Sequence, residues 1–215
     1  MPMIRQIPHR LEFGWRQEAA NYTGAELPPL NAEPEPLPEC TRFAFILASA
    51  IASFLIFSVR GVSTDLVFQA GFVLCVLLLA FINVETQILP DQVSLTVMWI
   101  GLVYQSVRGK GADQISGAAL GYMVPYVISL VWRFLAKKEF VGGGDMKVFA
   151  MAGAWVGLKS MPTLFVVFCI SGAVIGVVAK LTDRTGPNGF ISTGPMHFLA
   201  SLAVVLGFNF GSPWY

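Results

Sequence analysis

LVFQAGFVLCVLLLAFI, residues 66–82, is a run of seventeen residues without one charged side chain. A helix that crosses the hydrocarbon core of a membrane needs about twenty mostly apolar residues, with a lower limit near seventeen. Six further apolar runs are present, some short enough to tilt or to enter the membrane only partway: Phe43–Val59, Val93–Tyr104, Ile115–Trp132, Met146–Leu158, Leu164–Ala179 and Met196–Phe208. Because the runs lack the two-residue alternation of barrel strands, the sequence predicts an all-α polytopic membrane protein. Its fold is a bundle of about seven spanning or half-spanning helices.

The composition of the chain agrees with this class. Hydrophobic residues make up 55% of the chain and charged residues only 13%, whereas soluble domains usually carry about a quarter. So little charge leaves too few polar groups to cover a surface in water, and we expect the lipid bilayer to surround the chain. The net charge of +1 indicates no nucleic-acid partner. The three cysteines form no C-x-x-C pair, so the sequence predicts neither a metal site nor a disulfide framework.

The N-terminal region differs from the rest of the chain because it is polar. Its stretch from Leu27 to Pro38 is rich in proline, which resists helix formation. It has no apolar segment of the kind that a cleavable signal peptide needs. We expect residues 1–41 to form a cytoplasmic arm and residues 42–215 to form one membrane-embedded domain.

The lysines and arginines predict the orientation of the helices. With a cytoplasmic N-terminus, ten of the fourteen fall on the cytoplasmic side and four on the other, in line with the positive-inside rule. Residues 83–91 and 142–147 then both lie at the cytoplasmic face. The ten are Arg5, Arg10, Arg16, Arg42, Arg133, Lys137, Lys138, Lys147, Lys180 and Arg184, and the four are Arg60, Arg108, Lys110 and Lys159.

The sharpest local motif is GGGDMK, residues 142–147, which precedes an apolar run. Gly142, Gly143 and Gly144 allow backbone conformations closed to other residues and a close approach of neighbouring chains. Asp145 is expected at or near a helix N-terminus, where the helix dipole favours the charged carboxylate while burial favours the neutral form. A carboxyl group held between these effects suits acid–base chemistry. The alternative is a flexible glycine loop with Asp145 as a plain N-cap.

A second polar stretch is FINVETQILPD, residues 81–91, at the end of the apolar run quoted first. Pro90 prevents this helix from continuing unbroken. Asn83 lies close to the apolar end, where an unpaired polar group is costly, and taken alone it reads as a capping or packing residue. Asp91 fits the N-cap of the following helix.

Together the pattern N-x-x-x-Q-x-L-P-D, a further helix and G-x-G-D-x-K resembles the bacterial type IV prepilin peptidases, which belong to the G-x-G-D group of intramembrane aspartic proteases. In that family the first catalytic aspartate stands seven residues before the proline, a place that Asn83 occupies, and the second maps onto Asp145. Presenilin-like and signal-peptide-peptidase-like proteases share G-x-G-D but lack the L-P-D turn. Other agreeing stretches are Gln87, Leu89 to Asp91, Ser94 to Thr96, Trp99 to Leu102, Lys147, Gly153 to Gly157 and Gly194-Pro195.

The resemblance implies an endopeptidase of the bacterial inner membrane that cleaves the leader peptide of type IV prepilins or type II secretion pseudopilins. Cleavage would follow a glycine at the cytoplasmic face, and two carboxyl groups would activate water without a cofactor. The three glycines and Pro90 would position the substrate backbone. Lys147 would stabilise Asp145, contact substrate or, the reading we favour, anchor the helix at the cytoplasmic face.

Asn83 is the main departure from the family pattern. Aspartic proteolysis needs two carboxyl groups that share a proton, and an amide cannot ionise or exchange that proton. We therefore expect the chain as it stands to be inactive. Three explanations remain: an introduced inactivating substitution, a natural silent relative, or a shifted dyad that uses Glu85. The last requires a rearranged backbone, because residues 83 and 85 project about 200° apart on a helix.

A second departure concerns methyl transfer. Family members that also methylate their product carry two C-x-x-C pairs in a cytoplasmic loop, and residues 1–40 contain none. This counts against transfer of a methyl group from S-adenosylmethionine.

Two functions outside peptidase chemistry remain open. A pseudoenzyme would bind prepilins without cutting them. A small transporter would place Asn83 and Asp145 in a polar cavity between helices, a reading that an internal repeat would support, although no convincing repeat is present.

Overall fold

The computed structural model describes residues 39–60, 64–86, 88–136, 142–181 and 192–208. The predicted arm therefore lies almost wholly outside the described residues. The chain divides into two compact units, residues 1–48 and 49–215. Of the first unit, only the beginning of the first described helix is seen, and the arrangement below concerns the second unit.

Seven α-helices and one short 3-10 helix account for the regular structure of the described ranges, which contain no strand. Each of the seven predicted apolar runs falls in its own helix, so the prediction of an all-α bundle with about seven helices is confirmed. Two runs extend beyond their α-helices: Leu158 begins the 3-10 helix, and the run Met196–Phe208 continues past the end of α8 at Val205. The elements are α2 (Glu39–Arg60), α3 (Thr64–Thr86), α4 (Asp91–Val107), α5 (Gly111–Ala136), α6 (Gly143–Val156), η1 (Leu158–Ser160), α7 (Met161–Leu181) and α8 (Gly194–Val205).

Within the described residues, three segments are long and apolar enough to cross a membrane: Asp65–Val84, Gly111–Leu135 and Leu158–Leu181. Helix α6 has only fourteen residues and is surrounded by other helices, because every residue from Asp145 to Val156 except Lys147 is buried. A helix in this position is covered by protein on all sides, so it need not match the thickness of the lipid.

The helices of the second unit have apolar side chains on both their inner and their outer faces. The inner ones, such as Phe72, Met151 and Leu164, pack in one core around α6. The outer ones, such as Phe134 on α5 and Val177 on α7, are exposed. Apolar surface on this scale is not stable in water, and it identifies the chain as a membrane protein.

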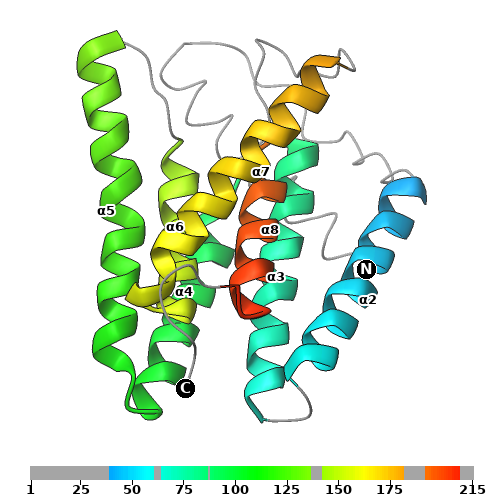
Figure 1. The fold of residues 1–215 in the computed structure, drawn as a ribbon, viewed down its shortest axis with the longest axis vertical. Helices are drawn as coiled ribbons and strands as arrows, with labels where there is room; N and C mark the ends of the chain where they lie inside the picture. Colours follow the sequence, from blue (N-terminus) through cyan, green and yellow to red (C-terminus); the bar gives the residue numbers. More distant parts are fainter. Residues whose placement is uncertain (1–38, 61–63, 87, 137–141, 182–191, 209–215) are drawn as a thin grey trace, which may run out of the picture. The chain divides into compact units, whose positions relative to one another are not determined.

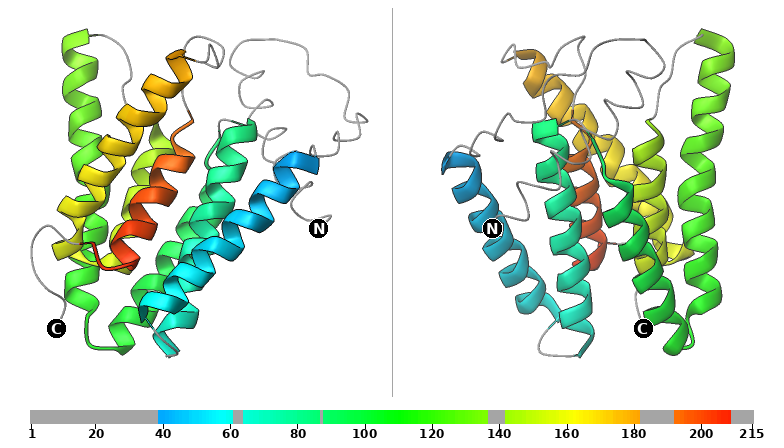
Figure 2. Two further views of the ribbon diagram at one scale, coloured as in Figure 1. Left: turned by 45° about the vertical axis from the view of Figure 1, so that its right-hand side comes forward. Right: turned by 180° about the vertical axis from the view of Figure 1, so that it is seen from behind.

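Helices α3 to α8 run alternately up and down (Figures 1 and 2). The ends of α3, α5 and α7 and the starts of α4, α6 and α8 therefore lie at one end of this unit, at the top of Figure 1. Both polar stretches singled out in the sequence, residues 83–91 and 142–147, are at this end. Their expected placement at one face of the bundle is seen, and the first turn of α8 joins them there.

Backbone contact between α5 and α6 is the closest helix crossing in the core. A Cβ atom on Gly153 would lie 2.2 Å from the carbonyl oxygen of Gly117, and one on Gly117 would lie 2.6 Å from the carbonyl oxygen of Gly153. One turn further along α5, a Cβ on Gly121 would lie 2.4 Å from the carbonyl oxygen of Phe149. Small residues allow such contact, which is a main source of helix association in membranes.

Trp155 joins α6 to α4. Its Nε1–H donates to the carbonyl oxygen of Val97 at 2.9 Å, and Gln105 Nε2 donates to the carbonyl oxygen of Trp155 at 3.1 Å. The indole lies on Gly101, where a Cβ would be only 2.5 Å from Nε1. These contacts set the position of α6 along its axis.

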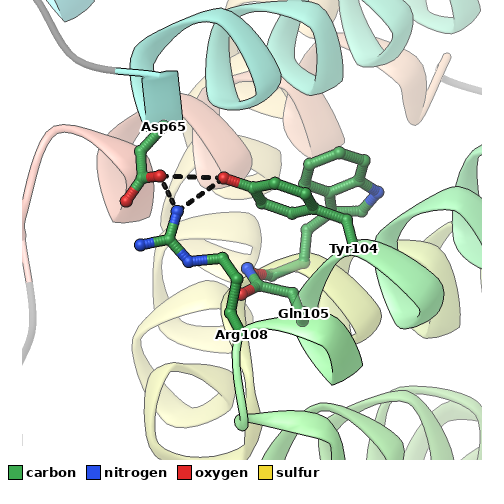
Figure 3. A network of polar contacts seen from close by, with 5 residues as sticks. Asp65, Tyr104, Gln105 and Arg108 are labelled. Carbon is green, nitrogen blue, oxygen red and sulfur yellow. Dashed lines mark hydrogen bonds and ion pairs between the residues drawn. The ribbon is translucent and has the colours of Figure 1, made fainter.

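A polar network ties the start of α3 to the end of α4 (Figure 3). It lies at the bottom of Figure 1, at the end of the unit opposite the two motifs. The hydroxyl of Tyr104 donates to Asp65 Oδ1 at 2.9 Å, and Arg108 donates to that hydroxyl at 2.7 Å and pairs with Asp65. The polar groups of these three side chains are thereby hydrogen-bonded or ion-paired with one another.

The α5–α6 crossing predicts the effect of adding a methyl group. We expect Gly153→Ala to lower the free energy of unfolding by about 1–3 kcal/mol, because the backbone of Gly117 cannot move away. Gly71→Ala in α3 is the matched control, since nothing lies within 4 Å of its Cβ position; it should be neutral or stabilising by up to about 1 kcal/mol. Thermal unfolding in detergent measures both. Equal stability of the two variants would contradict the crossing.

Candidate active site

Asn83 lies in the last turn of α3 and is 4% exposed. Its Oδ1 accepts two hydrogen bonds, from the backbone N–H of Gly194 at 2.8 Å and from the hydroxyl of Ser192 at 2.7 Å. A backbone N–H can only donate, so the atom facing it must be the acceptor. A carboxylate oxygen would accept both bonds equally well.

Gly194, the first residue of α8, brings that helix against α3. A Cβ atom at this position would lie 2.6 Å from Ala80 Cα and 3.0 Å from Asn83 Cβ. Only glycine permits this approach, and Pro195 follows it in the first turn, where its missing N–H has no cost. The close contact is what allows the N–H of Gly194 to reach Asn83.

Asp145 lies in the first turn of α6 and is largely buried. Its Oδ1 is 3.0 Å from His197 Nε2. The side chain of Thr193 and the backbone of Gly142 also hydrogen-bond the carboxylate. The predicted position near a helix N-terminus is confirmed. The alternative that Asp145 is a plain N-cap is wrong, because Gly142 occupies the N-cap position of α6. The backbone N–H of Asp145 donates to the carbonyl oxygen of Gly142 at 3.1 Å.

Residues 192–197, which lead into α8 and form its first turn, therefore contact both motif positions. Ser192 and Gly194 hold Asn83, whereas Thr193 and His197 hold Asp145. In the sequence, only the Gly194-Pro195 pair of this segment agrees with the family pattern. A histidine in an otherwise apolar helix was the available signal, since ionisable residues at membrane depth are rarely there without a function.

The L-P-D turn packs against the glycine motif. A Cβ on Gly144 would be 3.0 Å from Leu89 Cβ, and Lys147 Nζ pairs with Asp91 Oδ2. The prediction that Asp91 caps α4 is wrong: Pro90 is the N-cap, without a side-chain bond, and Asp91 is the first helical residue. Its carboxylate is turned toward Lys147 instead.

The three glycines of the motif have ordinary backbone conformations, contrary to expectation. Gly142 is extended, with φ −67° and ψ 149°, and Gly143 and Gly144 are helical. The expected close approach of a neighbouring segment is seen only at Gly144, which lies against Leu89. A Cβ on Gly143 would meet nothing within 4 Å, and one on Gly142 would meet only Asp145 Oδ2, at 3.4 Å. These two exposed glycines leave open space beside the carboxylate.

Two further expectations concern the alternative dyad and metals. The side chain of Glu85 lies outside the described residues. Within the described ranges, no group of three or more His, Cys, Asp and Glu side chains could hold a metal ion.

The contact of α8 with α3 predicts a strong effect of Gly194→Ala. Because the backbone of Ala80 blocks the added methyl group, α8 must move away and the bond from Gly194 to Asn83 is lost. We expect a loss of about 1–3 kcal/mol in the free energy of unfolding. Gly143→Ala, with open space around it, is the control and should not lose stability. Thermal unfolding in detergent distinguishes the pair; an unchanged melting temperature for Gly194→Ala would refute the contact.

The Lys147–Asp91 ion pair predicts a small coupling energy. Both side chains are about one-third exposed, at 31% and 33%, so we expect about 0.2–1 kcal/mol, decreasing at high salt. A double-mutant cycle with Asp91→Asn and Lys147→Met measures it by unfolding at low and high salt. Lys159→Met, at an exposed position, should show no coupling to Asp91→Asn. A coupling that salt does not change would argue against an ion pair.

Comparison with known proteins places the chain in a family. Residues 70–177 match the model of the type IV leader peptidase family. Similar curated proteins are named prepilin leader peptidase/N-methyltransferase. That of Burkholderia pseudomallei (strain K96243) is 33% identical over 154 residues, 68% of this chain and 48% of the relative. That of Aeromonas salmonicida is 30% identical over 139 residues, which are 64% of this chain and 48% of the relative. That of Neisseria gonorrhoeae is 34% identical over 119 residues, which are 54% of this chain and 40% of the relative.

The chain spans about half the length of the curated relatives it matches. No solved structure gives a significant match. The family model covers both polar motifs and the helices between them. The chain belongs to the type IV leader peptidase family.

Proposed function

We propose that this chain has the site of a membrane aspartic endopeptidase that removes the leader peptide of type IV prepilins or type II secretion pseudopilins, and that Asn83 disables it. The observation that carries the proposal is the convergence of Asn83 and Asp145 on the first turn of α8. Two positions distant in sequence are thereby held at one end of the bundle, as an aspartic dyad requires. Family membership and the names of the relatives support the substrate class.

The surroundings of position 83 suit a carboxyl group. Ser192 and Gly194 both donate to Oδ1 of Asn83. An aspartate has nearly the same shape, so one of its oxygens would keep both bonds and the other would stand where the amide nitrogen now lies. The amide cannot take up or release the shared proton, so Asn83 preserves the packing of the site but removes one of its two catalytic groups.

In the intact dyad, Asp145 would act as the base. It would take a proton from water while the water oxygen attacks the peptide carbonyl, and the carboxyl group at position 83 would protonate the carbonyl oxygen. Collapse of the tetrahedral intermediate breaks the C–N bond. The nitrogen leaves with the proton that Asp145 took from the water, and the carboxylate at position 83 recovers its proton from a hydroxyl of the intermediate. Proteolysis of this kind needs no cofactor.

The open space at Gly142 and Gly143 is the proposed place for the substrate backbone. Gly142 is extended and leads directly to Asp145, so an unwound substrate segment could lie along it as an added strand. Gly144, Pro90 and Lys147 would act indirectly, because they hold the L-P-D turn against the start of α6.

The proposed location is the bacterial inner membrane, with the N-terminus and the site at the cytoplasmic face. The uneven distribution of lysine and arginine supports this orientation. In the same proposal residues 1–41 form the cytoplasmic arm and residues 42–215 the peptidase domain. The curated relatives are named as N-methyltransferases too, but the chain contains no C-x-x-C pair. We propose peptidase chemistry for this site, and that chemistry needs no S-adenosylmethionine.

A non-catalytic prepilin-binding protein is the second candidate. It is favoured by the good fit of Asn83, whose acceptor oxygen is fully used by Ser192 and Gly194. Such a protein would keep the substrate-binding surface of the family and bind prepilins without cutting them.

Restoring the carboxyl group tests the proposal. We expect Asn83→Asp in liposomes to cleave a type IV prepilin at a rate at least about 10²–10⁴-fold above that of the chain as given, because both acid and base are then present. The control combines Asn83→Asp with Asp145→Asn and should be inactive. Gel analysis of the prepilin, with mass spectrometry of the new N-terminus, measures cleavage.

Other results would change the assignment. Equal cleavage by the chain as given would show that position 83 is not catalytic. Binding of the prepilin without cleavage by any variant would support the non-catalytic candidate. If no variant binds or cleaves the prepilin, both candidate functions are contradicted.

A further inference from the structure

The side chain of His197 is buried, at 2% exposure, and contacts the motif residue Asp145. We propose that it is a positioning residue, which donates Nε2–H to Asp145 Oδ1, fixes the orientation of that carboxylate and keeps it charged as the base of the dyad. The proposal rests on the proposed function for its catalytic consequence. The contact itself exists in the chain with Asn83.

The imidazole of His197 is clamped between two aromatic rings. The ring of Phe149 packs against it edge-on, with centroids 4.5 Å apart and an interplanar angle of 69°. The ring of Phe168 lies 4.7 Å away at 48°. Phe149 stands one turn after Asp145 on α6, so one helix face supplies both the packing surface and the acceptor. A ring held in this way cannot follow a moving carboxylate, so the carboxylate must take the orientation that the ring imposes.

The other partners of Asp145 indicate that His197 is the donor. Thr193 and the backbone of Gly142 also hydrogen-bond the carboxylate, and the first turn of α6 favours a negative charge. Several donors around one carboxyl group stabilise its ionised form. An ionised carboxylate only accepts, so the proton of this contact belongs to Nε2.

No competing charge faces the imidazole among the described residues of the helices packed on it. From α6, Asp145 contacts it, whereas Lys147 pairs with Asp91. From α7 the contact is Phe168, and on α3 the neighbouring polar group is the neutral Asn83. Helix α8 itself has no acidic or basic residue besides His197.

The contact makes the two catalytic positions unequal. Asp145 receives the imidazole N–H, whereas position 83 receives a hydroxyl and a backbone N–H. In the restored dyad, Asp145 would therefore take the proton from water, and the shared proton would start on the carboxyl group at position 83 and pass to the carbonyl oxygen. His197 keeps its own proton throughout.

Cleavage kinetics in the Asn83→Asp background provide the first test. His197→Leu removes the donor and should lower kcat about 10- to 100-fold with little change in KM, because a misplaced base slows only the chemical step. The acidic limb of the pH profile should move to higher pH, since a buried carboxyl group without its donor ionises less readily. His197→Gln, which offers an amide N–H, should recover most of kcat and the original limb.

Phe165→Leu is the control for packing alone. Phe165 packs on Phe149, with ring centroids 4.9 Å apart, and is not one of the two rings that clamp His197. This variant should lower thermal stability while keeping the pH profile. Unchanged kcat and pH profile in His197→Leu, or the same shift in Phe165→Leu, would overturn the proposal.

A second measurement does not depend on activity. Nitrogen-15 NMR of imidazole-labelled protein, on the chain as given, should show His197 with a proton on Nε2, and Asp145→Asn should change that signal. The only other histidine, His9, is removed by substitution for assignment. An unprotonated Nε2 would overturn the proposal. A protonated Nε2 combined with an inactive Asn83→Asp chain would keep the contact and reject the peptidase assignment.

Discussion

Close backbone contact through glycine is the constraint on which the rest of the bundle depends. Helices surrounded by lipid gain little from hiding apolar side chains, so their association relies on packing and on polar contacts between them. Gly153 meets Gly117 at the α5–α6 crossing, and Gly194 meets Ala80 where α8 touches α3. The first contact places the short, buried helix α6, and the second places the start of α8. The site lies between these two helices and α3.

The polar groups of the site are stable at this depth because they satisfy one another. An unpaired polar group in apolar surroundings costs several kcal/mol by order of magnitude. Asn83 is paired with Ser192 and Gly194, and Asp145 with His197. The cost of burying such groups is thus largely offset by residues 192–197, at the start of α8. This arrangement also explains how Asn83 is accommodated: the fold needs an acceptor oxygen at position 83, and the amide supplies one.

The structure separates two roles within the second motif. Gly144 and Lys147 fasten the start of α6 to the L-P-D turn, whereas Gly142 and Gly143 leave space next to Asp145. A single G-x-G-D sequence thus serves packing on one side and access on the other.

The sequence by itself determined the class, the seven apolar helices of the described residues and the two motif positions. Apolar runs such as residues 66–82 are long and uncharged, and in lipid a segment of this kind forms an α-helix because the helix satisfies its own backbone hydrogen bonds. It also identified Asn83 and Asp145 through motif spacing. Only the tertiary structure decided what surrounds them. His197 and Ser192 lie far along the chain from these positions, and their contacts depend on how α8 packs on α3 and α6, which no local pattern records. The capping role expected of Asp91 was wrong for a related reason: Pro90 occupies the N-cap, and the carboxylate of Asp91 pairs with Lys147 on another helix.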